Sequence, residues 1–190
     1  WFAPYALATG NTYIIKPSQQ TPISQMELAQ LILDAGFPPG VLTILHGTAE
    51  VGEALCRHED VQGVSFVGST PVAKRVYETA TAAGTRAQCQ GGAKNFLVVL
   101  PDAVMDAAVS NMMGSIFGCA GERCLAGSNI IAVGDAYEDL KQRLVSTTRA
   151  IKLGNGLDPA TGMGPVISQA AKERIINHID GAVTEGVRAI

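Results

Sequence analysis

Apolar residues recur along the chain in short β-branched runs, and longer amphipathic segments separate these runs. The runs occupy residues 12–16, 41–45, 64–67, 96–100 and 129–133. Each has the length and composition of a buried strand. The segments between them carry apolar residues at the three- and four-residue spacing of helices. Strands that alternate with helices predict an α/β fold with a mostly parallel sheet.

Start signals mark two of the expected helices, and apolar stripes mark others. Thr21 is expected to cap one helix, with Pro22 in its first position and Gly36 at its end. Thr70 and Pro71 predict a second start of the same kind. The apolar face of the first helix contains Leu28, Leu31, Ile32 and Ala35, and stripes expected to face the core contain Val109, Met112, Met113 and Ile116, then Tyr137, Leu140 and Leu144, then Ala171, Ile175, His178 and Ala182.

The Gly-Gly pair at residues 91 and 92 interrupts the pattern before the strand at 96–100, which predicts a domain boundary near residues 91–94. The chain begins at Trp1 and ends at Ile190 within an apparent passage from helix to strand. We therefore expect it to be an internal piece of a longer protein.

Composition favours a globular protein that acts on small molecules. Of the 190 residues, 47% are hydrophobic, and 14 basic residues against 17 acidic ones give a net charge of -3. This balance provides no basic surface for nucleic acid or an anionic membrane. The first 15 residues are uncharged, but Pro4 and Gly10 interrupt them, and we predict neither a signal peptide nor a membrane span.

The cysteines and histidines do not form a metal-binding pattern. The cysteines have no CxxC pairs and the histidines form no Ser-His-Asp or zinc grouping. Free thiols fit a cytoplasmic or mitochondrial-matrix location. The residues concerned are Cys56, Cys89, Cys119 and Cys124, with His46, His58 and His178 as structural or surface residues.

One turn has the chemistry of a phosphate site. The segment VSFVGSTP at residues 64–71 places Gly68 and Ser69 between a strand and a helix start, where free backbone N–H groups and the helix dipole attract an anion. Lys16 follows another strand and could reach an anion at the same sheet edge. An ordinary capped helix and a solvated lysine are equally compatible with these residues.

A second segment, FGCAGERCLA at residues 117–126, contains a candidate nucleophile. Small residues around Cys124 leave its sulfur open to a substrate. Arg123 would favour a thiolate there, whereas Glu122 would oppose it, so the sequence leaves the sign of the pKa shift open. The alternative is a buried, inert thiol.

Five segments in order resemble the aldehyde dehydrogenase superfamily: GNTYIIKPSQQTP, AGFPPGVLTILHG, VSFVGST, FGCAGERC and GMGPVIS. The resemblance spans essentially the whole chain. It implies an aldehyde dehydrogenase-like α/β fold, with part of a Rossmann-type NAD-binding domain at residues 1–92 and part of the catalytic domain at residues 93–190. It also implies a complete protein that forms homodimers or homotetramers.

The resemblance assigns roles to individual residues. Cys124 matches the family's nucleophile, and its backbone N–H would form part of the oxyanion hole. Cofactor-binding residues implied in the same way are Lys16, Ser18 and Gln19 near the adenine ribose, Gly68 and Ser69 at the pyrophosphate, and Gly91 near the nicotinamide.

Two positions depart from the family's usual pattern. Gln90 stands where hydrolytic members have the Glu that activates water, and an amide cannot accept that proton. Gln19 stands where a Glu usually contacts the adenosine ribose hydroxyls, which weakens discrimination against a 2′-phosphate. NAD is the expected cofactor, and NADP stays open as an alternative.

The absent Glu favours a thiol as the acyl acceptor. A thiol of pKa about 8.5 is partly ionised at neutral pH and is strongly nucleophilic. The segment QGGAKNFLVVLPDA and His46 in TILHG are similar to the CoA-acylating methylmalonate-semialdehyde dehydrogenase branch, although that branch usually has Gln at residue 122 and Asn at residue 90. Coenzyme A is therefore the expected acceptor, malonate or methylmalonate semialdehyde the expected substrate, and Arg123 a candidate contact for the substrate carboxylate or a CoA phosphate.

Two other functions remain open from the sequence. One is a hydrolytic aldehyde dehydrogenase that releases a free acid, with Glu122 or a residue beyond the chain as base. The other is a truncated, inactive dinucleotide-binding module, because the family's upstream oxyanion Asn and its downstream Glu-x-Phe-Gly-Pro region have no counterpart in these residues.

Overall fold

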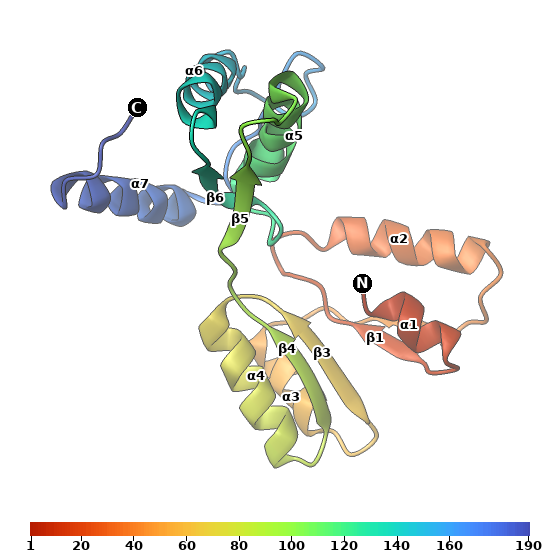
Figure 1. Ribbon diagram of the computed structural model, residues 1–190. Coiled ribbons are helices and arrows are strands. Elements are labelled where there is room, and N and C mark those ends of the chain that lie inside the picture. The colour runs from red at the N-terminus through yellow and green to blue at the C-terminus, as the bar shows by residue number, and fades with distance from the viewer. The chain divides into compact units, whose positions relative to one another are not determined.

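A computed structural model describes all 190 residues (Figure 1). The chain forms two compact units, Trp1–Gly92 and Ala93–Ile190. Each unit alternates helices with strands, and every strand pair is parallel, as the sequence predicts.

The first unit contains four helices and four strands in alternation. In chain order these are α1 (Ala3–Ala8), β1 (Tyr13–Ile15), α2 (Ile23–Asp34), β2 (Leu42–Ile44), α3 (Ala49–Arg57), β3 (Gly63–Val67), α4 (Thr70–Ala82) and β4 (Arg86–Gln90). Strand β1 pairs with β2, and β3 pairs with β4 over all five residues of each strand. Helices α3 and α4 pack together, and α4 also contacts β4.

The second unit is built around one strand pair and three α-helices. Its elements are β5 (Asn95–Val99), α5 (Met105–Phe117), the 3-10 turn η1 (Gly118–Gly121), β6 (Gly127–Ala132), α6 (Ala136–Arg149) and α7 (Gln169–Thr184). Strands β5 and β6 pair with a register shift between Asn95 and Phe96. The core lies where these strands meet α5 and α6, and its buried members are Val99, Val109, Met112, Ala136 and Leu140.

The five predicted strands are present, within two residues of their expected ends, and the structure adds β4. Its sequence, RAQCQ, has no β-branched residue, so strand propensity gave no signal there. The alternating burial of Ala87 and Cys89 shows that packing on one face of β4 stabilises the strand instead. The expected single sheet is not seen, because hydrogen bonding joins the six strands as three separate pairs.

Both predicted helix caps are wrong by one residue. Helix α2 begins at Ile23, after Pro22, and the Thr21 hydroxyl makes no capping bond. Helix α4 begins at Thr70 itself, after Ser69 in an extended conformation. Thr70 is not the cap because its hydroxyl accepts a hydrogen bond from the Gly92 N–H at 3.0 Å, a contact 22 residues away in sequence.

The core-facing stripes are confirmed in α5 and only in part elsewhere. Val109 and Met112 are buried, and Met113 and Ile116 pack against the same core, so the methionines serve packing. Tyr137 on α6 and His178 on α7 are exposed, which corrects the expectation for both residues. The predicted face of α2 is also largely exposed, with Leu31 at 64%.

Candidate functional site

Cys124 lies in an irregular segment between α5 and β6, and its thiol is free and exposed. The Cys124 thiol is therefore not buried. The preceding residues turn sharply, because Cys119, Ala120 and Gly121 all have positive φ, at 51°, 54° and 74°. For a residue with a side chain this conformation costs roughly 1–2 kcal/mol. Contacts around the segment must hold the turn, and such strain is typical of functional sites.

Two polar side chains hold this segment at either end. The Asn95 amide donates to the carbonyl oxygens of Cys124 and Ala126, at 2.8 Å and 2.9 Å. The Glu122 carboxylate accepts from the Ile167 N–H at 3.3 Å, immediately before α7. A carboxylate is stabilised at a helix N-terminus, so this contact ties the cysteine segment to the start of α7.

Arg123 contacts a different cysteine from the one it adjoins. Its Nε donates to Cys119 Sγ at 3.2 Å. The guanidinium lies so close to Gly118 that a Cβ there would stand 2.8 Å from Nη1. Gly118 therefore allows the arginine to lie over the turn, and the remaining guanidinium N–H groups are available to an anion.

In the first unit, the start of α4 and the end of β4 come together. The Gly68 N–H donates to the Gln90 carbonyl at 3.2 Å, one bond beyond the β3–β4 ladder. A Cβ on Gly68 would lie 2.6 Å from the Phe66 ring, and one on Gly91 would lie 2.8 Å from Thr70 Oγ1. A Cβ on Gly91 would also approach the Thr70 backbone, so this position needs glycine, whereas one on Gly68 would displace the Phe66 ring.

This corner presents backbone donors to an anion. The first turn of α4 closes with the bond from the Ala73 N–H to the Ser69 carbonyl at 2.8 Å. The N–H groups of Thr70 and Val72 precede that bond and have no partner within the helix. Together with exposed Ser69, they form the kind of helix N-terminus that binds phosphate groups.

Lys16 lies at the end of β1 with its ammonium already oriented. Its Nζ donates to the carbonyls of Pro17 and Gly47, at 2.9 Å and 3.0 Å. Its side chain passes beside Gly52 on α3, where a Cβ would be 3.8 Å away. An ammonium has three donors, so one remains for a ligand.

The other predicted ribose-binding residues form an exposed turn after Lys16. Ser18 Oγ accepts from the Gln20 N–H at 3.2 Å, and Gln19 is exposed. Gln90 is exposed at the end of β4. The side chains of Ser18, Gln19 and Gln90 are therefore accessible to a ligand.

Cys119 is exposed like Cys124, whereas the thiols of Cys56 and Cys89 are less available. Burial raises the pKa of Cys56 on α3, with smaller contributions from Cys89 and Glu53, and burial also raises the pKa of Cys89 on β4. No cluster of His, Cys, Asp and Glu could hold a metal ion, and His46, His58 and His178 are exposed. No helix combines the length and apolar character that a membrane span requires.

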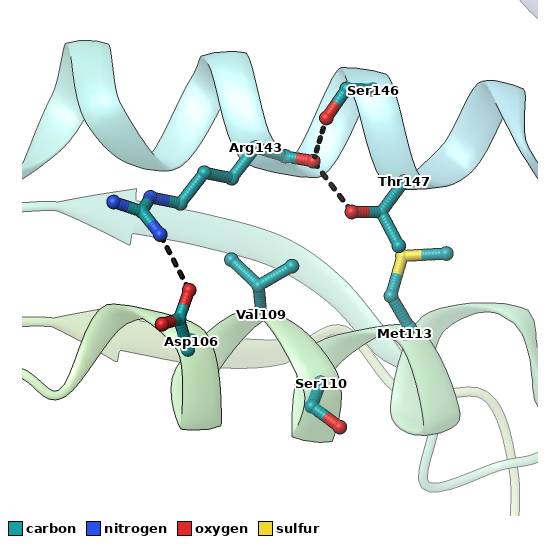
Figure 2. Close-up of a pocket in the computed structure, with 7 residues that line it drawn as sticks. All are labelled: Asp106, Val109, Ser110, Met113, Arg143, Ser146 and Thr147. Atoms are coloured by element: carbon teal, nitrogen blue, oxygen red, sulfur yellow. Dashed lines mark hydrogen bonds and ion pairs between the residues drawn. The ribbon is translucent and has the colours of Figure 1, made fainter.

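A pocket of about 360 Å³ lies between α5 and α6 (Figure 2), and none of the predicted site residues lines it. The carboxylate of Asp106 accepts from Arg143 at 2.5 Å across it, and hydrogen bonds to Asp139 and Asp106 raise the pKa of Arg143. The hydroxyls of Ser146 and Thr147 donate to the Arg143 carbonyl, within α6. Most of the polar groups in the pocket therefore bind one another, and only the Ser110 hydroxyl has no partner.

Sequence reasoning missed Asn95 at these sites, and it predicted Thr70 as a helix cap without its bond to Gly92. Asn95 bonds to residues 29 and 31 positions away, and Thr70 bonds to one 22 positions away. No local pattern announces such a contact. The only sequence signal was the position of each residue, Asn95 at a strand start and Thr70 beside a helix start.

The chain is similar in sequence to a known protein family and to curated proteins. The family model for the aldehyde dehydrogenase family matches residues 1–190. Malonate-semialdehyde dehydrogenase 3 of Geobacillus kaustophilus (strain HTA426) is 49% identical over 186 residues, which cover 98% of this chain and 38% of that protein. The chain thus spans a little over a third of the length of the curated relatives it matches.

Solved structures agree with this fold. The crystal structure of methylmalonate-semialdehyde dehydrogenase from Oceanimonas doudoroffii matches with a TM-score of 0.89 at 43% identity, over 97% of this chain and 38% of that one. The structure of PnpE in complex with nicotinamide adenine dinucleotide matches with a TM-score of 0.88 at 37% identity, over 95% of this chain and 37% of that one.

Proposed function

The chain belongs to the aldehyde dehydrogenase family. From this we propose that the whole protein oxidises a semialdehyde to an acyl-CoA. The observation that carries the proposal is the exposed, free thiol of Cys124 in a strained segment that side chains hold at both ends. Residues 93–190 would supply the nucleophile, and residues 1–92 would bind the cofactor.

The reaction begins at the Cys124 sulfur. Its thiolate adds to the aldehyde carbonyl carbon, and the resulting hemithioacetal oxyanion is stabilised by backbone N–H groups, including that of Cys124. Loss of a hydride from that carbon leaves a thioester on Cys124. Holding the backbone rigid beforehand favours this step, because the donors need no reorganisation as charge develops.

The cofactor we propose is NAD, which when bound accepts the hydride. The residues present fit it: Gly68, Ser69 and the free N–H groups of α4 suit a pyrophosphate, and Lys16 keeps one donor free beside exposed Ser18 and Gln19. Gly91 provides backbone without a side chain at the same corner. Among the matching structures, PnpE is a complex with nicotinamide adenine dinucleotide. Because Gln19 is neutral, NADP stays the alternative cofactor. Measuring turnover with NAD and with NADP tests it.

The second half of the reaction needs an acyl acceptor. Gln90 cannot act as a general base for water, and removal of a positioned base commonly costs about 10²–10⁴ in rate. One oxygen of the Glu122 carboxylate accepts from the Ile167 N–H and the other has no hydrogen-bond partner, so Glu122 stays the alternative base. A CoA thiolate attacks the thioester without such a base, forms the acyl-CoA bond and releases the Cys124 thiolate.

The substrate we propose is malonate or methylmalonate semialdehyde. Before CoA attacks, the bond between the carboxylate and the α-carbon of the Cys124 thioester would break, CO₂ would leave, and the resulting enolate would take a proton from water. CoA then receives an acetyl or propionyl group. Matching proteins carry the names malonate-semialdehyde and methylmalonate-semialdehyde dehydrogenase. Arg123 is the proposed contact for the substrate carboxylate or a CoA phosphate, since it keeps guanidinium N–H groups free beside the nucleophile. Near-normal kinetic constants for both substrates in Arg123→Ala would remove that role.

Product analysis of the whole protein with NAD and malonate semialdehyde, with and without CoA, tests the proposal. We expect acetyl-CoA only when CoA is present, and no product from Cys124→Ala. Gln90→Glu should raise release of free acid without CoA by at least about tenfold, because it restores a base. Gln88→Glu, on the same exposed face of β4, is the matched control and should not.

The outcomes separate the rival functions. Equal turnover to free acid without CoA would show a hydrolytic enzyme with another base. Binding of NAD by the whole protein without turnover, whether or not CoA is present, would support an inactive dinucleotide-binding module.

A further inference from the structure

Asn95 is the first residue of β5, yet its side chain serves a segment 29 residues away. Its Nδ2 lies 2.8 Å from the Cys124 carbonyl oxygen and 2.9 Å from the Ala126 carbonyl oxygen. Carbonyl oxygens only accept, so the group that faces them must be the NH₂ of the amide. Both of its hydrogens are therefore engaged, one on each side of Leu125.

The strand pairing aims this side chain. Asn95 pairs with Gly127 while Phe96 pairs with Asn129, so one extra residue of β6 is accommodated at this point. Such a bulge redirects a side chain and is common beside active sites. Gly127 itself lies so close to Leu97 that a Cβ would stand 2.5 Å from the leucine's Cδ1. The local backbone is thus fixed where Asn95 projects from it.

The segment that Asn95 holds has little other support. Leu125 is 69% exposed, so the small side chain of Ala126, at 6%, is the only apolar anchor between Cys124 and β6. A turn bond from the Ala126 N–H to the Arg123 carbonyl, at 3.0 Å, closes the segment on itself but does not tie it to the sheet. The two bonds from Asn95 make that connection.

We propose that Asn95 is the positioning residue for the nucleophile. By holding the carbonyls of Cys124 and Ala126, it fixes the peptide planes that follow the cysteine and so orients both the sulfur and the Cys124 N–H toward one substrate position. This inference rests on the proposed function. It concerns the rate of the step at Cys124 and not the binding of the cofactor in the first unit.

The test is a series of variants in the whole protein that removes donors in steps. Asn95→Ser keeps one donor, Asn95→Ala keeps none, and Asn95→Asp places acceptors of the same size against the two carbonyls. We expect kcat to fall in that order, by about 10²-fold in the last variant, since small misplacements of reacting groups have effects of that size. The KM for NAD should stay within about twofold of the wild-type value. The rate at which iodoacetamide alkylates Cys124, without substrate or cofactor, should depart further from the wild-type rate in the same order of variants.

Two control variants separate positioning from general stability. Ser115→Ala removes the acceptor for the Gly127 N–H, a 3.1 Å bond in the same unit, and Asn111→Asp makes the same chemical change at an exposed residue of α5. We expect both to retain wild-type kcat, even if the first lowers the thermal midpoint as much as the Asn95 variants do. Equal loss of kcat in Ser115→Ala at an equal loss of midpoint would overturn the positioning role.

Cys124→Ala shows which of the two proposals fails. If it is inactive while Asn95→Ala and Asn95→Ser keep wild-type kcat, only the positioning role is wrong. If it retains activity, the proposed function is wrong and the role of Asn95 falls with it.

Discussion

The four thiols of this chain differ in their surroundings, and their reactivity should differ accordingly. Cys119 and Cys124 are exposed, whereas burial raises the pKa of Cys56 and Cys89. The thiolate is the nucleophile, so at pH 8 iodoacetamide should label the two exposed residues before the other two. Peptide mass spectrometry after partial labelling of the 190-residue chain measures this order.

The same pKa shifts make the stability of the folded chain depend on pH. Because the pKa of Cys56 and Cys89 is raised in the folded chain, their stabilising effect is present below the ordinary thiol pKa and is lost as pH rises through the raised value.

The control for the labelling experiment is the unfolded chain, because in denaturant all four thiols should react with iodoacetamide at similar rates. Labelling of Cys56 as fast as Cys124 in the folded chain would contradict the burial that the structure shows for α3.

At the scale of single residues, the sequence predicted the features that depend only on neighbouring residues. The small neighbours of Cys124 predicted an accessible sulfur, and the structure has it exposed. The partners of Arg123 and Glu122 could not be predicted in the same way. Arg123 turns back to Cys119, and Glu122 reaches a residue 45 positions further on. Both contacts depend on how the chain folds back on itself, which the neighbouring residues do not specify.

Among the elements, the junction between β4 and α4 depends on a close approach at Gly91. In Gly91→Ala, the new methyl group would lie 2.8 Å from Thr70 Oγ1 and 3.1 Å from Thr70 Cα. The backbone must shift to accommodate it, which threatens the bond from Gly92 to Thr70. We expect the free energy of unfolding of the first unit to fall by about 1–3 kcal/mol, as measured by urea denaturation.

Gly63→Ala on β3 is the matched control, because its methyl group would meet only the Arg86 carbonyl oxygen at an ordinary 3.9 Å. It should change the unfolding free energy by less than half as much. Equal losses in both variants would mean that general strand effects, and not contact with Thr70, explain the result. If the proposed cofactor site is correct, Gly91→Ala should also weaken NAD binding to the whole protein.

The elements themselves were largely predictable because their signals are periodic. Strands with β-branched residues and the stripe of Val109 and Met112 on α5 were visible in the sequence, and so was parallel pairing. Strand β4 was not, since Arg86, Gln88 and Gln90 carry no strand signal, and its stability comes from packing on its other face together with pairing to β3. The helix starts at Ile23 and Thr70 were each misplaced by one residue. The Thr70 hydroxyl bonds to Gly92 instead, while nothing in the structure explains the shift at Ile23.

For the chain as a whole, the exposed apolar surface is large for a protein of this composition. No large side chain is fully buried, and Phe96 and Val98 on one face of β5 are 61% and 60% exposed. Val98 is paired with Ile131 of β6, which is 46% exposed, so these side chains form a continuous apolar face on the second unit. Faces of this kind, beside unpaired strand edges, favour association.

We therefore expect the isolated 190-residue chain to self-associate at micromolar concentration and to bind a hydrophobic dye. Phe96→Lys should reduce both, because it places a charge in the centre of that face. Leu157→Lys is the control, since Leu157 is more exposed, at 91%, but lies in a turn outside any strand or helix. Sedimentation velocity across a concentration series distinguishes the variants. A monomeric wild-type chain that binds no dye would show that the β5 face is covered within the chain itself, contrary to the exposure of Phe96. Equal relief by both substitutions would instead assign the association to overall hydrophobicity and not to this face.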